Sequence, residues 1–578
     1  MENWYLINKP ENYNIIKDNE NLTSFQKILL ANRDIVDEYK INSIFNSSVD
    51  NLHSSLKMKD MKKGVDILLD SMMKEEKILI SGDYDQDGVA ATVILYKGLN
   101  LFYDNISYAI PDRIEDGYGL NKNIVDDCIE NDIRLIITCD NGIAAFEAIE
   151  YARENGIRVI VTDHHEVVNI DGKDVLPNAD AVINPHRMDD DYPFDGICGA
   201  VVAYKFIDAI IELYGSSLGI KKQSIYFLLQ YAMLGTVCDM MKIVDENRII
   251  VVEGLKIINQ TKNLGIKSLL REINWQKDVD IYTVGFLIGP IINASGRIYT
   301  AKLGVELLLT NDEEEAMTYS KTLVELNNER KEMTQKSVEV AIEKIEYENI
   351  HKNDIIIVYD SSIHESICGL VAGRIKDRYN KPTLVLTDSS NDGIIKGSGR
   401  SINAYNMFEH FNKFRDDFVA FGGHAMACGL SIEKTKLDKF NKNIQEDSGL
   451  VEEDFRKIID LDYGLNFNNI NKNLINQINA LKPYGYGFAE PIFASKNVIV
   501  KDVFILGKDK NVLKFNFEQN GENLQAISFR IDDIIDKLKI SINEIYNIKN
   551  KEYDIVYKIG ENTFNGYTNI QLNLISMR

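Results

Sequence analysis

Short apolar runs, each followed at once by polar residues, recur three times in the first third of the chain. Lys77–Ser81, Arg134–Thr138 and Arg158–Thr162 are rich in Ile, Leu and Val and have the length of short buried strands. Segments with helical apolar spacing separate or precede them, as in Met58–Met73. This alternation predicts a doubly wound parallel sheet. The residues that follow the three runs should therefore meet, because the carboxyl ends of parallel strands share one edge.

Acidic residues and histidines occupy these strand-end positions. The set is Asp85, Asp87, Asp140, Asp163, His164 and His165. Carboxylates mixed with imidazoles suit Mg2+ or Mn2+, whereas zinc is more often held by cysteines or a histidine-rich set. A single Asp after a strand is often only a helix N-cap, and adjacent histidines often lie on the surface. Three such clusters at one predicted edge favour a shared divalent-metal site.

Two further residues are candidates for the same edge. In "YAMLGTVCDMM" an apolar run is expected to break at Gly235 and to present Asp239, which could complete the metal site or merely cap a turn. Arg113 follows another predicted strand and could clamp a phosphate through its two-pronged guanidinium. The alternative for Arg113 is a surface ion pair with Glu115 or Asp116.

The middle of the chain predicts a turn and then a long helix. The stretch "GFLIGPIINASGRIYTA" is expected to be a Gly- and Asn-rich turn that carries Asn293 and Arg297. Residues 312–349 are charged and helically periodic and contain neither Gly nor Pro. They predict a connecting helix at a domain boundary.

A second α/β domain is predicted from the strand Ile355–Val358 to about residue 447. It holds three stretches interpreted as polar turns, "HESICGLVAGRI", "KGSGRS" and "FGGHAMACGL". Gly-rich turns expose backbone N–H groups and let a phosphate backbone come close. The polar residues that could line an anion path with them are Arg374, Lys396, Ser398, Arg400 and His424.

The last part, from about residue 455, alternates short strand-like segments with turns and predicts a small barrel or sandwich. Phe493, Phe515, Phe517 and Tyr567 could stack bases on an oligonucleotide-binding barrel. The alternative is that they are core residues of the barrel.

Composition narrows the class of protein. The chain has 578 residues, 45% hydrophobic and 26% charged, which is ordinary for a soluble chain of several domains. Its six cysteines include no CxxC pair, as expected for a reduced cytoplasmic protein without structural zinc. We expect no signal peptide and no membrane span. The net charge of −23 requires any nucleic-acid site to be a local basic path on an acidic body.

Taken in order, the motifs resemble the DHH phosphoesterase superfamily and, within it, the bacterial RecJ exonucleases. They lie between about residues 75 and 495 and read "GDYDQDG", "DNGI", "DHH", "GTVCD", "NASGR", "KGSGRS", "FGGH" and "LKPYGYGFAEPIF". Small DHH phosphodiesterases and manganese pyrophosphatases lack the barrel that follows. A DHH enzyme acting on oligoribonucleotides or cyclic dinucleotides is the nearest alternative, and a non-catalytic DNA-binding scaffold is another, although such relatives lose metal ligands.

The resemblance implies the domain organisation. We expect an α/β protein with an N-terminal extension (1–50), a DHH-type parallel-sheet catalytic domain (51–310), a connecting helix (311–349), a second, DHH-associated α/β domain (350–450) and an OB-like barrel (455–578). Departures from the family pattern occur at Ser366, Gly373, Phe488 and Ala489. They affect the expected strand path and barrel packing and leave the metal site untouched.

The resemblance also implies a 5′ to 3′ exonuclease specific for single-stranded DNA, using two Mn2+ or Mg2+ ions in DNA repair and recombination. Its metal ligands would be Asp83, Asp85, Asp87, Asp140, His164 and Asp239, and His165 would be a further ligand or a substrate contact. Its substrate contacts would be Arg113, Asn293, Arg297, Arg374, Ser398, Arg400 and His424. We expect Asp140 to bridge the ions, because its strand lies between the other two, and Asp163 to orient an imidazole. The implied partners of this monomer are a DNA strand with a 5′ end, a single-strand-binding protein and a repair helicase.

Overall fold

The chain folds around a parallel sheet in its first half. The computed structural model describes residues 2–17, 22–112, 117–507, 511–529, 531–564 and 566–578. The five strands run in the order β3-β2-β4-β5-β8 and are all parallel. Their bounds are β2 Lys77–Ser81, β3 Ile106–Ala109, β4 Ile133–Cys139, β5 Arg158–Thr162 and β8 Ala181–Ile183. The predicted doubly wound sheet is confirmed.

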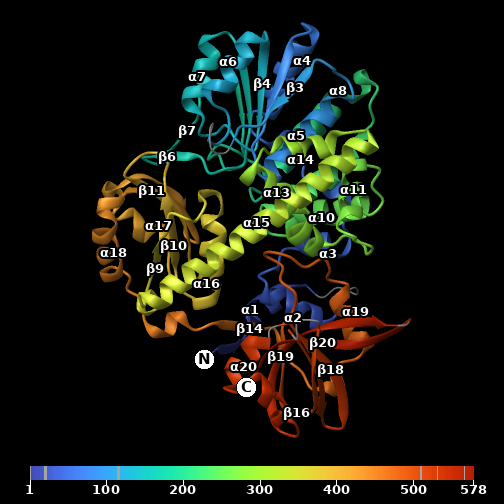
Figure 1. The fold of residues 1–578 in the computed structure, drawn as a ribbon. Helices are drawn as coiled ribbons and strands as arrows, with labels where there is room; N and C mark the ends of the chain where they lie inside the picture. Colours follow the sequence, from blue (N-terminus) through green and yellow to red (C-terminus); the bar gives the residue numbers. More distant parts are fainter. Residues whose placement is uncertain (1, 18–21, 113–116, 508–510, 530, 565) are drawn as a thin grey trace.

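Both faces of this sheet are buried under helices, which explains the unbroken apolar runs. The helices are α4 Met61–Met73, α5 Gln86–Leu99, α6 Lys122–Glu130, α7 Phe146–Glu154 and α8 Gly199–Leu218. Ile80 and Ile137 pack in one core with α4, α5 and α8. Their strand neighbours Leu79 and Ile136 point the other way, into a second core with α6 and α7. Figure 1 shows these helices on the two sides of the sheet.

A helical layer completes the catalytic domain. Its elements are α9 Leu229–Cys238, α10 Asp245–Ile258, α11 Leu264–Glu272, α12 Ile281–Thr283, the π-helix Val284–Ile288, α13 Gly289–Ile298 and α14 Lys302–Leu309. The expected turn at "GFLIGPIINASGRIYTA" is wrong, because buried Ile288, Ile291 and Ile292 hold the segment in helices. The expected break at Gly235 is also wrong, since α9 runs through it to Cys238.

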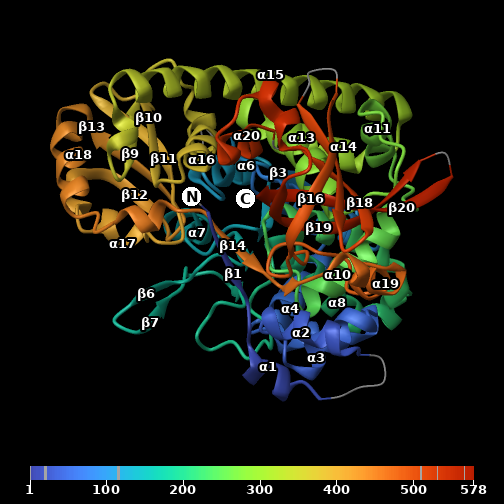
Figure 2. The same ribbon diagram turned by 90° about the horizontal axis from the view of Figure 1, so that it is seen from below.

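The predicted connecting helix is confirmed as α15, Glu313–Tyr347. Asp312 caps it by accepting hydrogen bonds from the backbone N–H groups of Glu314 and Glu315, at 2.8 and 2.9 Å. Figures 1 and 2 show α15 running from the catalytic domain to a second α/β domain.

The second domain has a mixed sheet in the order β12-β13-β11-β10-β9. Its elements are β9 Ile356–Tyr359, α16 Cys368–Tyr379, β10 Thr383–Asp388, β11 Ile394–Arg400, α17 Met407–Asn412, β12 Phe418–His424, β13 Ala427–Glu433 and α18 Leu437–Glu446. The turn interpretation is wrong for all three stretches. "KGSGRS" lies mainly in β11, and "FGGHAMACGL" is a hairpin of β12 and β13, because both pair along their length. "HESICGLVAGRI" is helical, because Glu365–Ile367 form a 3-10 helix and the residues from Cys368 onward lie in α16, where Val371, Ala372 and Ile375 are buried.

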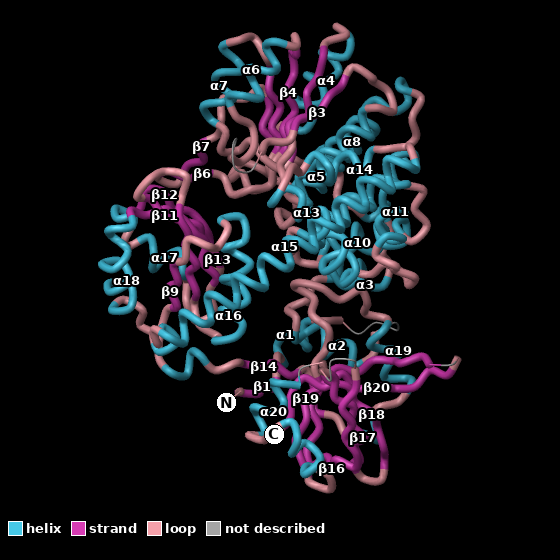
Figure 3. Tube along the Cα trace, viewed as in Figure 1, coloured by secondary structure: helices cyan, strands magenta, loops and turns pink. Residues whose placement is uncertain are grey.

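A five-stranded barrel forms the C-terminal domain and confirms the predicted fold class. Its elements are β16 Phe493–Leu506, β17 Val512–Gln519, β18 Glu522–Ser528, α20 Ile531–Leu538, β19 Glu552–Phe564 and β20 Tyr567–Met577, with α19 Lys472–Asn479 before them. Pairing of β16 with β19 closes it (Figure 3). Phe493, Phe515 and Phe517 are fully buried, so the base-stacking interpretation is wrong for them and they form the barrel core. Tyr567 is exposed.

The N-terminal segment joins the barrel to the catalytic domain. Its elements are β1 Asn3–Leu6, α1 Pro10–Ile15, α2 Ser24–Asn32 and α3 Glu38–Phe45. Strand β1 pairs in parallel with β14, Ile458–Leu461, and α3 packs against α10. Arg33 forms a two-pronged ion pair with Asp462 at 2.6 and 3.0 Å. None of the described helices has the length and hydropathy needed to cross a membrane.

Candidate two-metal active site

The loop after β2 places three carboxylates at the carboxyl end of the sheet. Gly82 is required at its start, because a Cβ there would lie 2.0 Å from Thr92 Oγ1. Asp85 caps α5, since its Oδ1 accepts from the backbone N–H groups of Asp87 (2.9 Å) and Gly88 (3.1 Å). The capping interpretation is therefore correct for Asp85, yet the same residue also has a carboxylate oxygen close to those of Asp83 and Asp140.

Asp87 is held by the start of a second helix. Its Oδ2 accepts from Gly199 N–H at 2.7 Å and its Oδ1 from Ala200 N–H at 3.0 Å, in the first turn of α8. The positive end of that helix stabilises the buried carboxylate. Gly235 of α9 borders the same carboxylate, because a Cβ there would lie 2.2 Å from Asp87 Oδ1. Likewise a Cβ at Gly199 would lie 2.4 Å from Asp140 Oδ1, so both glycines leave room for the acidic side chains.

Asp140 follows β4 with a left-handed backbone, φ +61°. Asp and Asn tolerate this conformation better than other non-glycine residues. Its carbonyl accepts a hydrogen bond from Tyr118 Oη at 2.8 Å, and its buried Oδ1 lies 3.1 Å from His164 Nε2. The strained backbone thus aims this carboxylate at the imidazole that follows β5.

Asp163 holds both histidines from behind. Its Oδ1 accepts from the backbone N–H of His164 (2.7 Å) and from the backbone N–H (3.1 Å) and Nδ1 (2.8 Å) of His165. Its Oδ2 accepts from Ile143 N–H at 2.9 Å. Burial opposes the charge of Asp163, but the hydrogen bond and charge of His165 lower its pKa below the usual range. Burial also acts to lower the pKa of His165, but the hydrogen bond that His165 donates to Asp163 overrides this and raises the pKa to about 9.

His164 is the meeting point of the cluster. Its Nε2 lies 3.1 Å from Asp140, 3.6 Å from Asp87 and 3.8 Å from Asp239. Three overlapping groups have ligand atoms within 4.8 Å of one another: Asp140, His164 and His165; Asp87, His164 and Asp239; and Asp83, Asp85 and Asp140. His164 and Asp140 each belong to two of these groups. The structure therefore brings together all the metal ligands expected from the sequence.

Burial and mutual repulsion raise the pKa values of the carboxyl groups in the cluster. Burial, followed by repulsion from Asp87, Asp85 and Asp83, raises the pKa of Asp140 well above its usual value. Burial and the charges of Asp87 and Asp85 raise the pKa of Asp239 to about 8. Burial lowers the pKa of His164, which lies beside these carboxylates. Divalent cations compensate the charge of such crowded buried carboxylates. Oxygen-rich donors with one or two imidazoles fit Mn2+ or Mg2+.

The residues expected to contact substrate are only partly brought together. Arg113 lies outside the described residues. Asn293 Oδ1 accepts from Gln86 N–H at 2.7 Å, which fixes α13 to the start of α5. Arg297 Nη1 donates to the carbonyl of Ser366 at 2.9 Å and so links the catalytic domain to the second domain.

Ser398 lines a groove of about 390 Å³ on the second domain, together with Lys396 and Ser366. Arg400 follows on the same strand, and its Nη1 donates to Gly399 O at 2.8 Å. Burial lowers the pKa of Arg400, and within the described chain no ion pair joins it to a carboxylate. Lys396, by contrast, forms an ion pair with Glu365.

Arg374 and His424 do not line this groove. Arg374 lies on α16 and donates from Nη1 to Gln335 Oε1 of α15 at 2.9 Å. His424 is exposed at the end of β12. Of the residues of the predicted anion path, Lys396 and Ser398 line the groove, and Arg400 lies two residues beyond Ser398 on the same strand.

Sequence reasoning missed two residues that shape the site. Tyr118 bonds the carbonyl of Asp140 and lies 3.1 Å from His165 Nδ1. Asn141 ties neighbouring strands together by donating to Ser81 O (3.0 Å) and Cys139 O (2.9 Å). The Asn of "DNGI" was a visible signal for the second, whereas only the fold places Tyr118 here.

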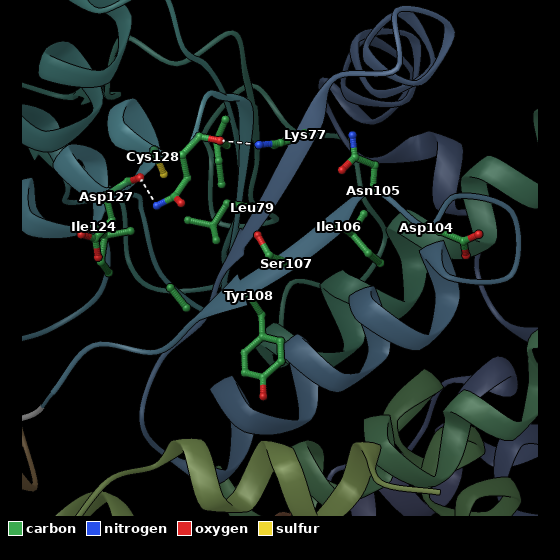
Figure 4. Close-up of a pocket in the computed structure, with 13 residues that line it drawn as sticks. Lys77, Leu79, Asp104, Asn105, Ile106, Ser107, Tyr108, Ile124, Asp127 and Cys128 are labelled. Atoms are coloured by element: carbon green, nitrogen blue, oxygen red, sulfur yellow. Dashed lines mark hydrogen bonds between the residues drawn. The ribbon is translucent and has the colours of Figure 1, made fainter.

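A separate cavity of about 420 Å³ lies beside the edge strand β3 (Figure 4). Lys77 and Ile133, the first residues of β2 and β4, line it. It therefore reaches the opposite end of the strands from the carboxylates, and none of the predicted site residues lines it.

Comparison with known proteins agrees with this geometry. Three protein-family models match: the DHH family N-terminal domain over residues 77–236, the DHHA1 domain over 352–447 and the RecJ OB domain over 461–576. Fold and site together define a phosphoesterase of the DHH type with an added barrel. At 32% identity over 533 residues, 89% of each chain, the chain is similar to the single-stranded-DNA-specific exonuclease RecJ of Haemophilus influenzae. The chain belongs to the RecJ family, as its motifs predicted.

Other relatives extend the comparison. The RecJ exonuclease of Bacillus subtilis is 32% identical over 510 residues, which are 86% of this chain but 63% of that longer relative. RecJ from Thermus thermophilus in complex with Mn2+ has the same fold, with a TM-score of 0.81 at 22% identity over 100% of this chain and 79% of that one. The crystal structure of exonuclease RecJ bound to manganese has a TM-score of 0.58 at 26% identity, covering 70% and 98%.

Proposed function

We propose that this chain is a metal-dependent exodeoxyribonuclease that removes nucleotides from single-stranded DNA in the 5′ to 3′ direction. The observation that carries the proposal is that three groups of candidate ligands overlap. Asp140 belongs to two of the groups, and His164 belongs to two of them. Membership of a family of single-stranded-DNA-specific exonucleases supports the substrate class.

The residues that would hold two divalent ions are Asp83, Asp85, Asp87, Asp140, His164, His165 and Asp239. Two Mn2+ or Mg2+ ions in such a site supply water activation and charge neutralisation at a phosphodiester. Asp140 is the proposed bridging ligand, because it belongs to two of the three groups and, unlike the imidazole of His164, has two oxygens that could each contact an ion. Asp163 acts as a positioning residue, since its hydrogen bonds fix both histidines.

A terminal 5′ phosphate would be held by donors from both domains. Arg400 and Ser398 come from β11, and Arg297 reaches from α13 to the backbone of the second domain. Guanidinium groups bind a doubly charged terminal phosphate better than a singly charged diester. This preference would start degradation at the 5′ end. Asn293, Arg374, His424 and Arg113 are the remaining proposed substrate contacts.

The test uses purified protein and single-stranded DNA labelled at either end, with Mn2+, with Mg2+ and with a chelator. We expect mononucleotides to be released from the 5′ end only when a divalent ion is present. Duplex DNA and oligoribonucleotides are the comparison substrates. Faster release from oligoribonucleotides than from DNA would favour another DHH activity. The proposal further includes a cytoplasmic location. Its proposed partners are a helicase, which supplies the single strands that such an enzyme needs, and a single-strand-binding protein.

A further inference from the structure

In the described part of the chain, the edge strand β3 of the catalytic sheet is paired on one side only. It pairs in parallel with β2, and no other described strand adjoins it. The carbonyls of Asn105 and Ala109 accept hydrogen bonds from backbone N–H groups on the β2 side, at 3.1 and 3.0 Å. Because backbone groups alternate in direction along a strand, those of Ile106 and Tyr108 point away from β2. Such an open edge is a template for a further strand.

The cavity of about 420 Å³ lies along this open edge (Figure 4). The consecutive residues 104–109 all line it. The side chains of Ile106 and Tyr108 pack against the core that contains α5, whereas Ala109 packs against the core that contains α6. Since successive residues of a strand face opposite ways, a cavity lined by all of them borders the backbone edge of β3.

Helix α6 forms the opposite wall of the cavity. The residues that line it from α6 recur at helical spacing and so share one face of the helix: Ile124, Asp127, Cys128 and Asn131. Ile124 and Cys128 are buried and pack in one core with Leu79 of β2, which also lines the cavity. A strand added beside β3 would therefore have an apolar surface on its α6 side.

The mouth of the cavity is acidic. Asp104 and Asp127 are exposed lining residues, and among the described residues neither has a cation as an ion-pair partner. Lys77, the cation among the described lining residues, donates to the carbonyl of Asn131 at 2.9 Å. The net charge of −23 disfavours a second copy of the chain at this edge, because like charges repel. The charge of the mouth favours a partner that carries lysine or arginine.

We propose that β3 is a docking edge for an extended, basic segment of a partner protein, which adds to the catalytic sheet as a sixth strand. The added strand places an apolar side chain in the cavity, against Ile124 and Cys128. A lysine or arginine beside it pairs with Asp104 or Asp127. Backbone hydrogen bonds supply the affinity of such a complex, and the cavity supplies its side-chain preference.

The docking edge is separate from the chemistry. The cavity reaches the end of the strands opposite the metal ligands, so a docked segment leaves the metal site open. The inference goes beyond the proposed function and does not depend on it.

The probe is a fluorescein-labelled peptide of about ten residues that alternates threonine with valine and carries lysine at both ends. A second peptide has glutamate in place of lysine. Two further versions of the lysine peptide carry N-methyl groups on alternate amides, so that each version blocks one edge of the extended chain. Binding to the full-length protein is measured by fluorescence anisotropy, and the place of binding by amide hydrogen exchange of residues 104–109.

Protein variants test the contacts. Asp104→Asn and Asp127→Asn together remove the charge of the mouth, and Ser107→Trp fills the cavity from an exposed position of β3. Asp171→Asn is the matched control, because Asp171 is exposed in the same domain, lies outside the cavity and has a left-handed backbone that Asn tolerates. Melting temperatures show whether each variant is folded.

We expect the lysine peptide to bind and to slow hydrogen exchange in β3. Its Kd should rise by about tenfold or more in the double Asp variant and in Ser107→Trp, and stay unchanged in Asp171→Asn. The glutamate peptide and one of the two N-methylated peptides should bind about tenfold more weakly or not at all, whereas the other N-methylated peptide should bind like the parent. None of these variants should change the nuclease rate on free DNA.

Equal binding of the two N-methylated peptides would overturn strand addition, and equal binding of the lysine and glutamate peptides would overturn the basic partner. Absence of binding at about millimolar peptide would overturn the proposal as a whole. Self-association of the protein that Ser107→Trp abolishes would assign the edge to a second copy instead. A protein that binds the lysine peptide in the expected way but degrades no DNA would refute the proposed function and leave this inference standing.

Discussion

The guanidinium of Arg248 lies over the ring of Phe488, 4.9 Å from its centroid. Arg248 is fully buried in α10 and donates to the carbonyls of Leu481 (2.8 Å), Lys482 (2.8 Å) and Pro483 (3.0 Å). One cation thereby fixes the segment that leads into the barrel against the catalytic domain. Phe488, one of the departures from the family pattern, fills the space between this guanidinium and that of Arg33, 5.8 Å from the same ring.

Replacing Arg248 by Met should loosen this junction. The substitution keeps the length of the side chain but leaves three backbone carbonyls without their donor, which costs roughly 3 kcal/mol or more. We expect a lower melting temperature by scanning calorimetry and earlier proteolysis near residues 481–490. Arg271→Met, at an exposed arginine of α11, is the control and should change stability by less than about 0.5 kcal/mol. Equal melting temperatures for the two variants would show that the junction does not depend on Arg248.

Asp140→Asn should abolish nuclease activity without unfolding the protein. Asn tolerates the left-handed backbone at this position, so the change removes a charge and little else. We expect the rate of nucleotide release to fall by about a thousandfold or more relative to the unsubstituted protein, because a ligand shared by both ions supports both. The rise in melting temperature on adding Mn2+ should shrink in parallel. Asp104→Asn, an exposed carboxylate of the same domain, should behave like the unsubstituted protein. A variant that kept a tenth of the rate would exclude Asp140 as the bridging ligand.

Stabilisation by metal should grow with pH. Burial first, and then the charges of Asp87 and Asp85, raise the pKa of Asp239 to about 8, whereas an unfolded Asp titrates near 3.9. Between these values the ion-free native state binds more protons than the unfolded state, so its stability falls as pH rises. A cation removes the repulsion that causes this loss. The difference in melting temperature with and without Mg2+ should therefore increase from about pH 5.5 to pH 7.5.

The control for this pH dependence is Asp239→Asn, which should reduce the increase because one of the carboxyl groups with a raised pKa is gone. A metal-induced shift that is the same at every pH in unsubstituted protein would contradict the assignment of Asp239 to the site.

Arg400→Ala should slow degradation most on strands that carry a 5′ phosphate. A charged hydrogen bond to a terminal phosphate is worth about tenfold or more in rate, and a 5′ hydroxyl cannot make it. The measurement is the ratio of initial rates on 5′-phosphate and 5′-hydroxyl substrates. Arg378→Ala is the matched control, because Arg378 is an exposed arginine on α16 of the same domain and is not a proposed substrate contact. If each variant slows the degradation of 5′-phosphate and 5′-hydroxyl strands by the same factor, Arg400 has only a structural role.

The local sequence was sufficient to predict the cluster of candidate metal ligands, because each of them except Asp239 comes shortly after a buried strand. Parallel pairing of β2, β4 and β5 then brings Asp85, Asp140 and His164 to one edge without further information. Short buried apolar runs also determined the sheet, since both of its faces must be covered by helices.

Local patterns failed where pairing or burial overrides composition. Glycines in "KGSGRS" and "FGGH" suggested turns, but these residues lie in paired strands, where the missing side chains allow close contact. A Cβ at Gly397, for example, would lie 1.9 Å from Val385 O. The Gly and Asn content of 285–301 likewise hid a run of helices whose buried isoleucines hold them in place.

The sequence by itself thus determined the chemistry, a set of oxygen and nitrogen ligands in a fixed order along alternating strands and helices. Only the tertiary structure decided which neighbours complete it. Gly199 and Gly235 make room for the carboxylates, Arg248 fixes the approach to the barrel, and α9 presents Asp239 at its end. These relations join residues far apart in the chain through packing, and packing depends on shape in three dimensions rather than on any periodicity along the sequence.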